Sequence, residues 1–78
     1  MRITVKAEWE EYSDGDEYQL VIAGYSAVVY KSERGAWPWR WGVVRVGSTH
    51  KIANGRLNTK EEAIAAAEAA IRKDAHNG

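Results

Sequence analysis

The sequence predicts one small α+β domain, in which an antiparallel sheet of three to four strands is followed by a single C-terminal α-helix packed on one face. Three observations support this fold class. Apolar residues alternate with polar ones through the first two thirds of the chain, turn residues separate the alternating segments, and an Ala-rich segment follows a helix-capping signal. A length of 78 residues fits one domain. We expect this domain to span residues 1–75, with residues 76–78 as a flexible C-terminal tail.

The first expected strand covers residues 3–12, where Ile3, Val5, Ala7 and Trp9 share one face. Residues 13–16 form a turn, because Asp-Gly readily supplies positive φ. Residues 17–31 are a second extended segment that is apolar on both faces. Within this segment, Gly24 marks a bulge or bend, or else opens a tight turn that splits the segment into two strands.

The third expected strand covers residues 37–46, and residues 50–57 form a short fourth strand. Pro38 cannot donate a ladder hydrogen bond, so we expect it at the start of a strand or on an edge strand. Its alternation puts three indoles and Val43 on one face, and Arg40, Val44 and Val46 on the other.

The helix has the clearest local signal. Thr59 and Glu62 have the spacing of a capping box, and the Ala-rich residues 63–73 favour helix. The predicted apolar stripe consists of Ala63, Ile64, Ala67, Ala70 and Ile71. Because these side chains are small, large side chains on the sheet must fill the remaining core volume, and the Trp residues are the natural candidates.

One helix covers only one face of a sheet. The opposite face, including Val44 and Val46, then has no cover from this chain. Exposed apolar character of this kind indicates a partner protein or a homodimer.

Composition predicts neither an enzyme nor a metalloprotein. The chain has no Cys, and its two histidines, His50 and His76, are 26 positions apart. We find no nucleophile beside an oriented base and no Gly-rich phosphate loop, so we expect no cofactor and no metal. The chain start lacks a signal-peptide core, and no run is long enough to cross a membrane. We therefore expect a cytoplasmic protein that does not bind membranes.

The net charge is zero, but the charge is unevenly distributed. Residues 8–17 contain six acids and no base, whereas residues 31–60 contain seven bases and one acid. Such asymmetry bears on the choice of partner.

Two candidate surfaces follow. The protein-binding hypothesis uses the acidic segment and the uncovered valines: Glu8, Glu10, Glu11, Asp14, Asp16, Glu17, Val44 and Val46. The nucleic-acid hypothesis uses the basic, Trp-rich segment: Arg40, Arg45, Lys51, Arg56 and Trp39. Indoles interleaved with bases can stack on nucleobases while the cations meet phosphates. The alternative, that the indoles fill the core beneath the Ala stripe, is favoured.

The stretch Val29-Tyr30-Lys31, Gly35, Trp39-Arg40-Trp41, Gly55 and Thr59 to Ala63 resembles two families over about residues 28–72. One is the YegP-like bacterial family, in which an aromatic-rich return strand precedes an Ala-rich helix. The other is the arm-site DNA-binding domain of phage integrases, whose sheet enters the major groove. The acidic N-terminal segment and the neutral charge depart from the integrase type. In size and element order the chain also resembles phage accessory proteins, some of which block host defence as anti-CRISPR proteins do.

These observations favour a non-catalytic protein-binding module, a phage or mobile-element accessory protein that acts on a host protein. The alternative function is DNA binding through the basic sheet, and the third is a structural homodimer.

Overall fold

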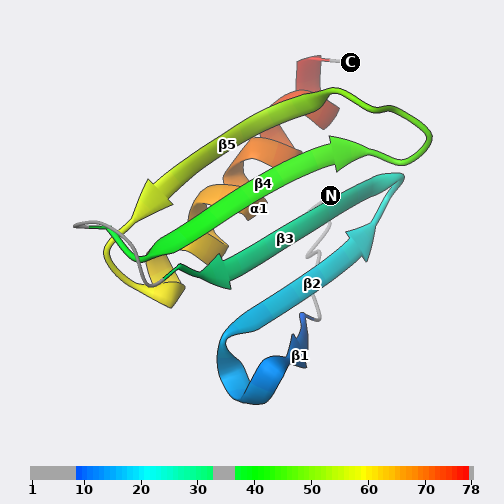
Figure 1. The fold of residues 1–78 in the computed structure, drawn as a ribbon. Coiled ribbons are helices and arrows are strands. Elements are labelled where there is room, and N and C mark those ends of the chain that lie inside the picture. Colours follow the sequence, from blue (N-terminus) through cyan, green and yellow to red (C-terminus); the bar gives the residue numbers. More distant parts are fainter. Residues whose placement is uncertain (1–8, 33–36, 78) are drawn as a thin grey trace, which may run out of the picture.

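In the computed structural model, which describes residues 9–32 and 37–77, a five-stranded antiparallel sheet carries one helix. The strands are β1 (Glu10–Tyr12), β2 (Glu17–Ile22), β3 (Tyr25–Lys31), β4 (Trp39–Arg45) and β5 (Lys51–Leu57), and the helix is α1 (Lys60–Asn77). The strands lie in the order of the sequence, as a simple meander (Figure 1). The predicted α+β class is confirmed. The part of the first predicted strand before Trp9 lies outside the described residues.

The prediction of three to four strands is wrong, because the second extended segment forms two strands. Ile22 pairs with Tyr25, which leaves Ala23 and Gly24 as a two-residue hairpin loop. Their φ angles are 51° and 83°. Positive φ at both loop positions is characteristic of the type I′ turn, whose twist matches that of the flanking strands. The tight-turn alternative at Gly24 is therefore the one the chain adopts.

The helix begins as predicted. Oγ1 of Thr59 accepts a hydrogen bond from the backbone N–H of Glu62 at 3.2 Å, and the Thr59 hydroxyl donates to Oε1 of Glu62 at 3.2 Å. The helix then continues through Asn77, beyond the Ala-rich residues 63–73 that favoured helix in the sequence. Side-chain bonds from the sheet to Asp74, described below, hold this last part of the helix.

The core lies between α1 and strands β2, β3 and β4. Val29, Val43, Ala63 and Ala67 are fully buried. The predicted helix stripe is confirmed, because all five of its residues belong to or pack against this core. Trp9, Trp39 and Trp41 also pack against this core, which confirms the core interpretation for Trp39 and Trp41. Trp37 is 59% exposed, so the interpretation is wrong for that indole.

The helix contacts β3, β4 and β5, whereas β1 and β2 project beyond it (Figure 1). No element of the described chain packs against the opposite face of the sheet. Within residues 9–32 and 37–77, one face is therefore uncovered, and the other is covered over only part of its width.

Two strand glycines differ sharply in their surroundings. Gly55 pairs with Trp41 across β4 and β5, and a Cβ added at Gly55 would lie 2.8 Å from the indole nitrogen of Trp41. Gly42 points to the other face, where an added Cβ would make only ordinary contacts at 3.8–3.9 Å. Gly55 is thus required by the packing of Trp41, and Gly42 is not required by its own surroundings.

We predict that Gly55→Ala lowers the free energy of unfolding by about 1–3 kcal/mol, the usual cost of overpacking. The matched variant Gly42→Ala should be neutral or stabilising by up to about 1 kcal/mol, because Gly is a poor strand residue. Urea unfolding followed by Trp fluorescence measures both. Equal stabilities of the two variants would contradict the assigned role of Gly55.

Candidate protein-binding face

The uncovered side of the sheet is the candidate site. Alternation along each strand and the register between strands place fourteen residues there, opposite to the core residues Leu20, Val29 and Val43. We call this set the open face: Glu10, Tyr12, Glu17, Gln19, Val21, Ser26, Val28, Tyr30, Arg40, Gly42, Val44, Lys51, Asn54 and Arg56.

The register arranges these side chains in rows that run across the strands. The first row, from β1 to β5, is Tyr12, Glu17, Tyr30, Arg40, Arg56. The second is Glu10, Gln19, Val28, Gly42, Asn54, and the third is Val21, Ser26, Val44, Lys51 across β2 to β5. The carboxylates therefore lie on β1 and β2, and the cations lie on β4 and β5.

The basic half of the open face contains a like-charge pair. Arg40 and Arg56 are directly opposite each other, and Lys51 lies on the same face beside Gly42. Like charges directly opposite each other on neighbouring strands are destabilising. Within the described residues, the Nε of Arg40 is buried and has no hydrogen-bond partner. Leaving such a group unsatisfied costs about 1–3 kcal/mol. The basic half is thus poorly satisfied by the described part of the chain.

In the acidic half, each of the two carboxylates accepts a hydrogen bond from a neighbouring side chain. The hydroxyl of Tyr12 donates to Glu10 at 2.7 Å, and the side-chain amide of Gln19 donates to Glu17 at 2.6 Å. The hydrogen bond to Glu10 raises the pKa of Tyr12 above its ordinary value. Both carboxylates are thereby oriented along the sheet surface, where they remain accessible to a partner.

Apolar and aromatic side chains lie between and beside the two charged halves. Val21 is 72% exposed, Tyr12 42% and Tyr30 36%, while Val28 and Val44 are half-buried. A face that combines exposed aromatics with valines and with charges of both signs resembles a protein interface in composition.

The structure divides the predicted acidic set. Glu10 and Glu17 lie on the open face, whereas Asp14 and Asp16 lie exposed in the β1–β2 turn. Glu11 points to the helix side, where it accepts a hydrogen bond from the hydroxyl of Tyr18 at 3.3 Å. Glu8 lies outside the described residues.

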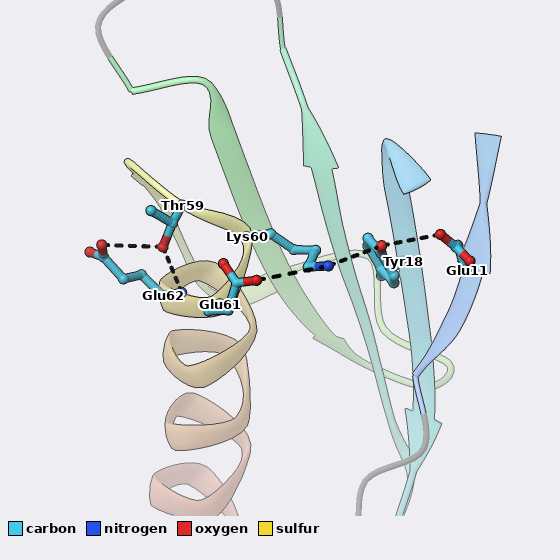
Figure 2. A network of polar contacts seen from close by, with 6 residues as sticks. All are labelled: Glu11, Tyr18, Thr59, Lys60, Glu61 and Glu62. Atoms are coloured by element: carbon cyan, nitrogen blue, oxygen red, sulfur yellow. Dashed lines mark hydrogen bonds and ion pairs between the residues drawn. The ribbon is translucent and has the colours of Figure 1, made fainter. Parts of the chain in front are cut away.

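Tyr18 links β1 to the start of the helix (Figure 2). Nζ of Lys60 donates to the hydroxyl of Tyr18 at 3.3 Å and lies 4.9 Å from the centre of its ring. This hydrogen bond raises the pKa of Lys60. Glu11 therefore belongs to a polar contact that fixes the β1–β2 hairpin to α1, and is not on the same surface as Glu10.

The predicted basic set is divided as well. Arg40, Lys51 and Arg56 converge on the open face, but Trp39 packs against the core on the helix side. Val44 lies on the open face, and Val46 follows the end of β4, where its N–H donates to the carbonyl of Gly24 at 2.8 Å. The structure therefore brings acidic, basic and apolar members of both predicted sets onto one surface.

Arg45 lies away from the open face, where it bonds the end of the helix. Its Nε and its terminal nitrogen donate to Oδ2 of Asp74 at 2.9 and 2.7 Å, and the hydroxyl of Tyr25 donates to the same oxygen at 2.6 Å. The bonds from Tyr25 and Arg45 lower the pKa of Asp74, and the bond to Asp74 raises the pKa of Tyr25. Arg45 is thus a structural residue that joins β3, β4 and α1.

The sequence alone did not show that Tyr12, Glu17, Tyr30 and Arg40 are neighbours in one row of the open face. The alternation of the second segment already separated Val28 and Tyr30 from the core residues. Which residues are neighbours depends on the register between the strands, and the register of β2 with β3 depends on the hairpin at Ala23 and Gly24.

Other chemistries have little support in the described residues. No group of three or more His, Cys, Asp and Glu side chains in residues 9–32 and 37–77 is placed to hold a metal ion. His50 is exposed in the β4–β5 loop, where its backbone N–H donates to Oγ of Ser48 at 3.2 Å. In the same part of the chain, no helix has the length and hydropathy needed to cross a bilayer.

Comparison of the chain with protein-family models, curated proteins and solved structures gives no match, so the resemblances drawn from the sequence remain predictions.

The bonds to Asp74 predict a pH dependence of stability. The folded pKa of Asp74 lies below its unfolded value, so its contribution is fully present above the unfolded pKa, which is about 4, and is lost as pH falls through the folded pKa. We expect Asp74→Asn to lower the urea midpoint at pH 7, and the difference from the unsubstituted chain to shrink below pH 4.

The control for this prediction is Asp16→Asn, which replaces an exposed acid in the β1–β2 turn. It should leave the urea midpoint at pH 7 unchanged. If Asp74→Asn and the control have the same midpoint at pH 7, the bonds to Asp74 do not stabilise the fold.

Proposed function

We propose that this chain is a non-catalytic protein-binding module and that the open face is its binding surface. The observation that carries the proposal is the arrangement of charge on that face, with Glu10 and Glu17 on one side of β3 and Arg40, Lys51 and Arg56 on the other. A surface with both signs side by side complements another protein better than a uniformly anionic polymer. A phage or mobile-element setting, predicted from the sequence, is part of this proposal.

Exposure of apolar groups supports the same conclusion. Val21 and Tyr30 stand on a sheet face that no described part of the chain covers. Strands with a solvated face ordinarily alternate hydrophobic and polar residues, so valines on the outer face are informative. A partner on this face would bury the exposed side chain of Val21. It could also accept a hydrogen bond from Nε of Arg40, which has no partner among the described residues.

Photocrosslinking tests the binding surface. A benzophenone amino acid at Val28, near the middle of the open face, should give adducts in a lysate of the cells that carry the gene. The same amino acid at Ala65, on the exposed side of α1, is the matched control and should give none. Adducts of equal yield from both positions, or none from either, would contradict a binding role for the open face.

A second candidate function is nucleic-acid binding, and the row of Tyr30, Arg40 and Arg56 favours it specifically. These three side chains are neighbours in the register, and they combine an aromatic ring with two guanidinium groups. Trp39 and Trp41 do not contribute, because they pack on the core side, and the exposed Trp37 precedes β4 and is not part of the open face. Intrinsic Trp fluorescence is therefore a poor reporter of the open face, and the anisotropy of labelled DNA is the better measurement.

We expect no saturable binding of mixed-sequence duplex or single-stranded DNA at 150 mM salt, because Glu10 and Glu17 repel phosphate beside the cations. If DNA does bind, its affinity should fall steeply with salt and fall further in Arg40→Glu. Salt-sensitive, saturable binding that Arg40→Glu abolishes would make the second candidate the function.

A further inference from the structure

We propose that the open face binds a second copy of this chain, face to face, about a twofold axis that runs along β3. This inference rests on the proposed function, because it names the partner of the same surface. The partners of a symmetric dimer present the same patch, so that patch must be complementary to itself. The rows of the open face have this property.

The first row demonstrates the match. β3 is the middle strand of the sheet (Figure 1). A twofold axis along β3 would therefore place β1 and β2 of one copy over β5 and β4 of the other, and β3 over β3. The row from Tyr12 to Arg56 then faces its own reverse. Glu17 meets Arg40 of the second copy, Tyr12 meets Arg56, and Tyr30 meets Tyr30.

The other rows agree with this arrangement. In the second row, Val28 meets Val28 at the axis, and Glu10 meets Asn54. In the third, the highly exposed Val21 meets Val44. These two rows therefore add two apolar pairings, at Val28 and at Val21, and place the carboxylate of Glu10 opposite an amide donor.

The alternative axis, perpendicular to the strands and in the plane of the interface, is unfavourable. With this axis through the second row, each strand would lie over its own copy, so that Glu10 met Glu10 and Arg56 met Lys51. Like-charge contacts of that kind act against an interface. The charge distribution therefore selects one of the two simple orientations.

The arrangement also resolves the unfavourable features of the isolated chain. A carboxylate from Glu17 of the second copy would lie over Arg40, whose Nε has no partner within the described residues. Tyr12 of the second copy would cover the guanidinium of Arg56, as in a cation–π contact. The product is a β-sandwich with the two α1 helices on its outer surfaces, a common way for sheets to pack.

The area of the open face determines the affinity expected for the dimer. Strands spaced about 4.8 Å apart, with three of them seven residues long, give a face of roughly 500 Å². Two such faces bury on the order of 1,000 Å² in total, the lower end of specific interfaces. We therefore expect a reversible dimer with a Kd in the micromolar range, weakened by salt.

The test exchanges charge across the axis. Glu17→Arg and Arg40→Glu each convert two attractive contacts of the dimer into repulsive ones, because symmetry repeats the pair. Each variant alone should dissociate at least tenfold more readily than the unsubstituted chain in sedimentation equilibrium. An equimolar mixture of the two should form a heterodimer, because both of its crossed pairs are then complementary.

Controls keep the outcome interpretable. Arg72→Glu reverses an exposed charge on α1 and should leave the dimer intact. Arg40→Glu should fold well, because it replaces the like-charge pair with Arg56 by an opposite-charge pair. Circular dichroism and urea unfolding verify the fold of each variant.

The inference is overturned if the unsubstituted chain stays monomeric up to 1 mM. It is also overturned if neither variant weakens the dimer, or if the two variants fail to associate with each other. The proposed function would then be judged separately by the crosslinked products. An adduct with twice the mass of the chain identifies a second copy. Adducts of other masses from Val28 alone identify a different protein on the same face.

Discussion

The packing of one small-sided helix on β3 and β4 determines most of what this chain can do. Ala63 and Ala67 are fully buried against a sheet whose Val29 and Val43 are also fully buried, so the backbones of helix and sheet approach closely. Small helix residues permit that approach but cover little area. The helix therefore contacts three of the five strands, and the chain has no second element among the described residues to cover the other face. An uncovered face follows directly from having one helix for five strands.

The β1–β2 hairpin extends past the helix; β2 contributes Leu20 to the core, and polar contacts join the hairpin to α1. Nε1 of Trp9 donates to Glu68 at 3.3 Å, and Tyr18 connects Glu11 to Lys60 (Figure 2). These hydrogen bonds are partly buried or exposed, and a single bond of this kind contributes only about 0.5–1.5 kcal/mol. The hairpin therefore depends on its ladder with β3 for its position, and its carboxylates Glu10 and Glu17 are carried at the least covered end of the sheet. A partner over the open face would hold this hairpin as well as the basic strands.

Much of the fold is visible in the sequence, because its signals are local. The capping box at Thr59 and the period of Ala63, Ala67 and Ile71 identify the helix and its buried side. The number of strands was not visible, because the turn residue at the first loop position is Ala23. Asn-Gly or Asp-Gly there would have signalled a hairpin, whereas alanine ordinarily avoids positive φ. The open face could be predicted only in part, for a related reason. Alternation assigns residues to the two faces of the sheet, but the register between strands decides which residues on a face are neighbours. Arg45 illustrates this, since its bond to Asp74 joins positions 29 residues apart.

The charge pattern of the open face is difficult to explain by stability alone. A chain selected only to fold would place opposite charges across β4 and β5, yet Arg40 and Arg56 stand opposite each other, with Lys51 on the same face. The carboxylates Glu10 and Glu17 are on the same face but on the far side of β3, and among the described residues no ion pair joins them to these cations. Separated complementary charges contribute little to an isolated monomer, because solvent screens them. They contribute most when a second surface brings each sign against its opposite, and this separation is the strongest physical argument that the open face is an interface.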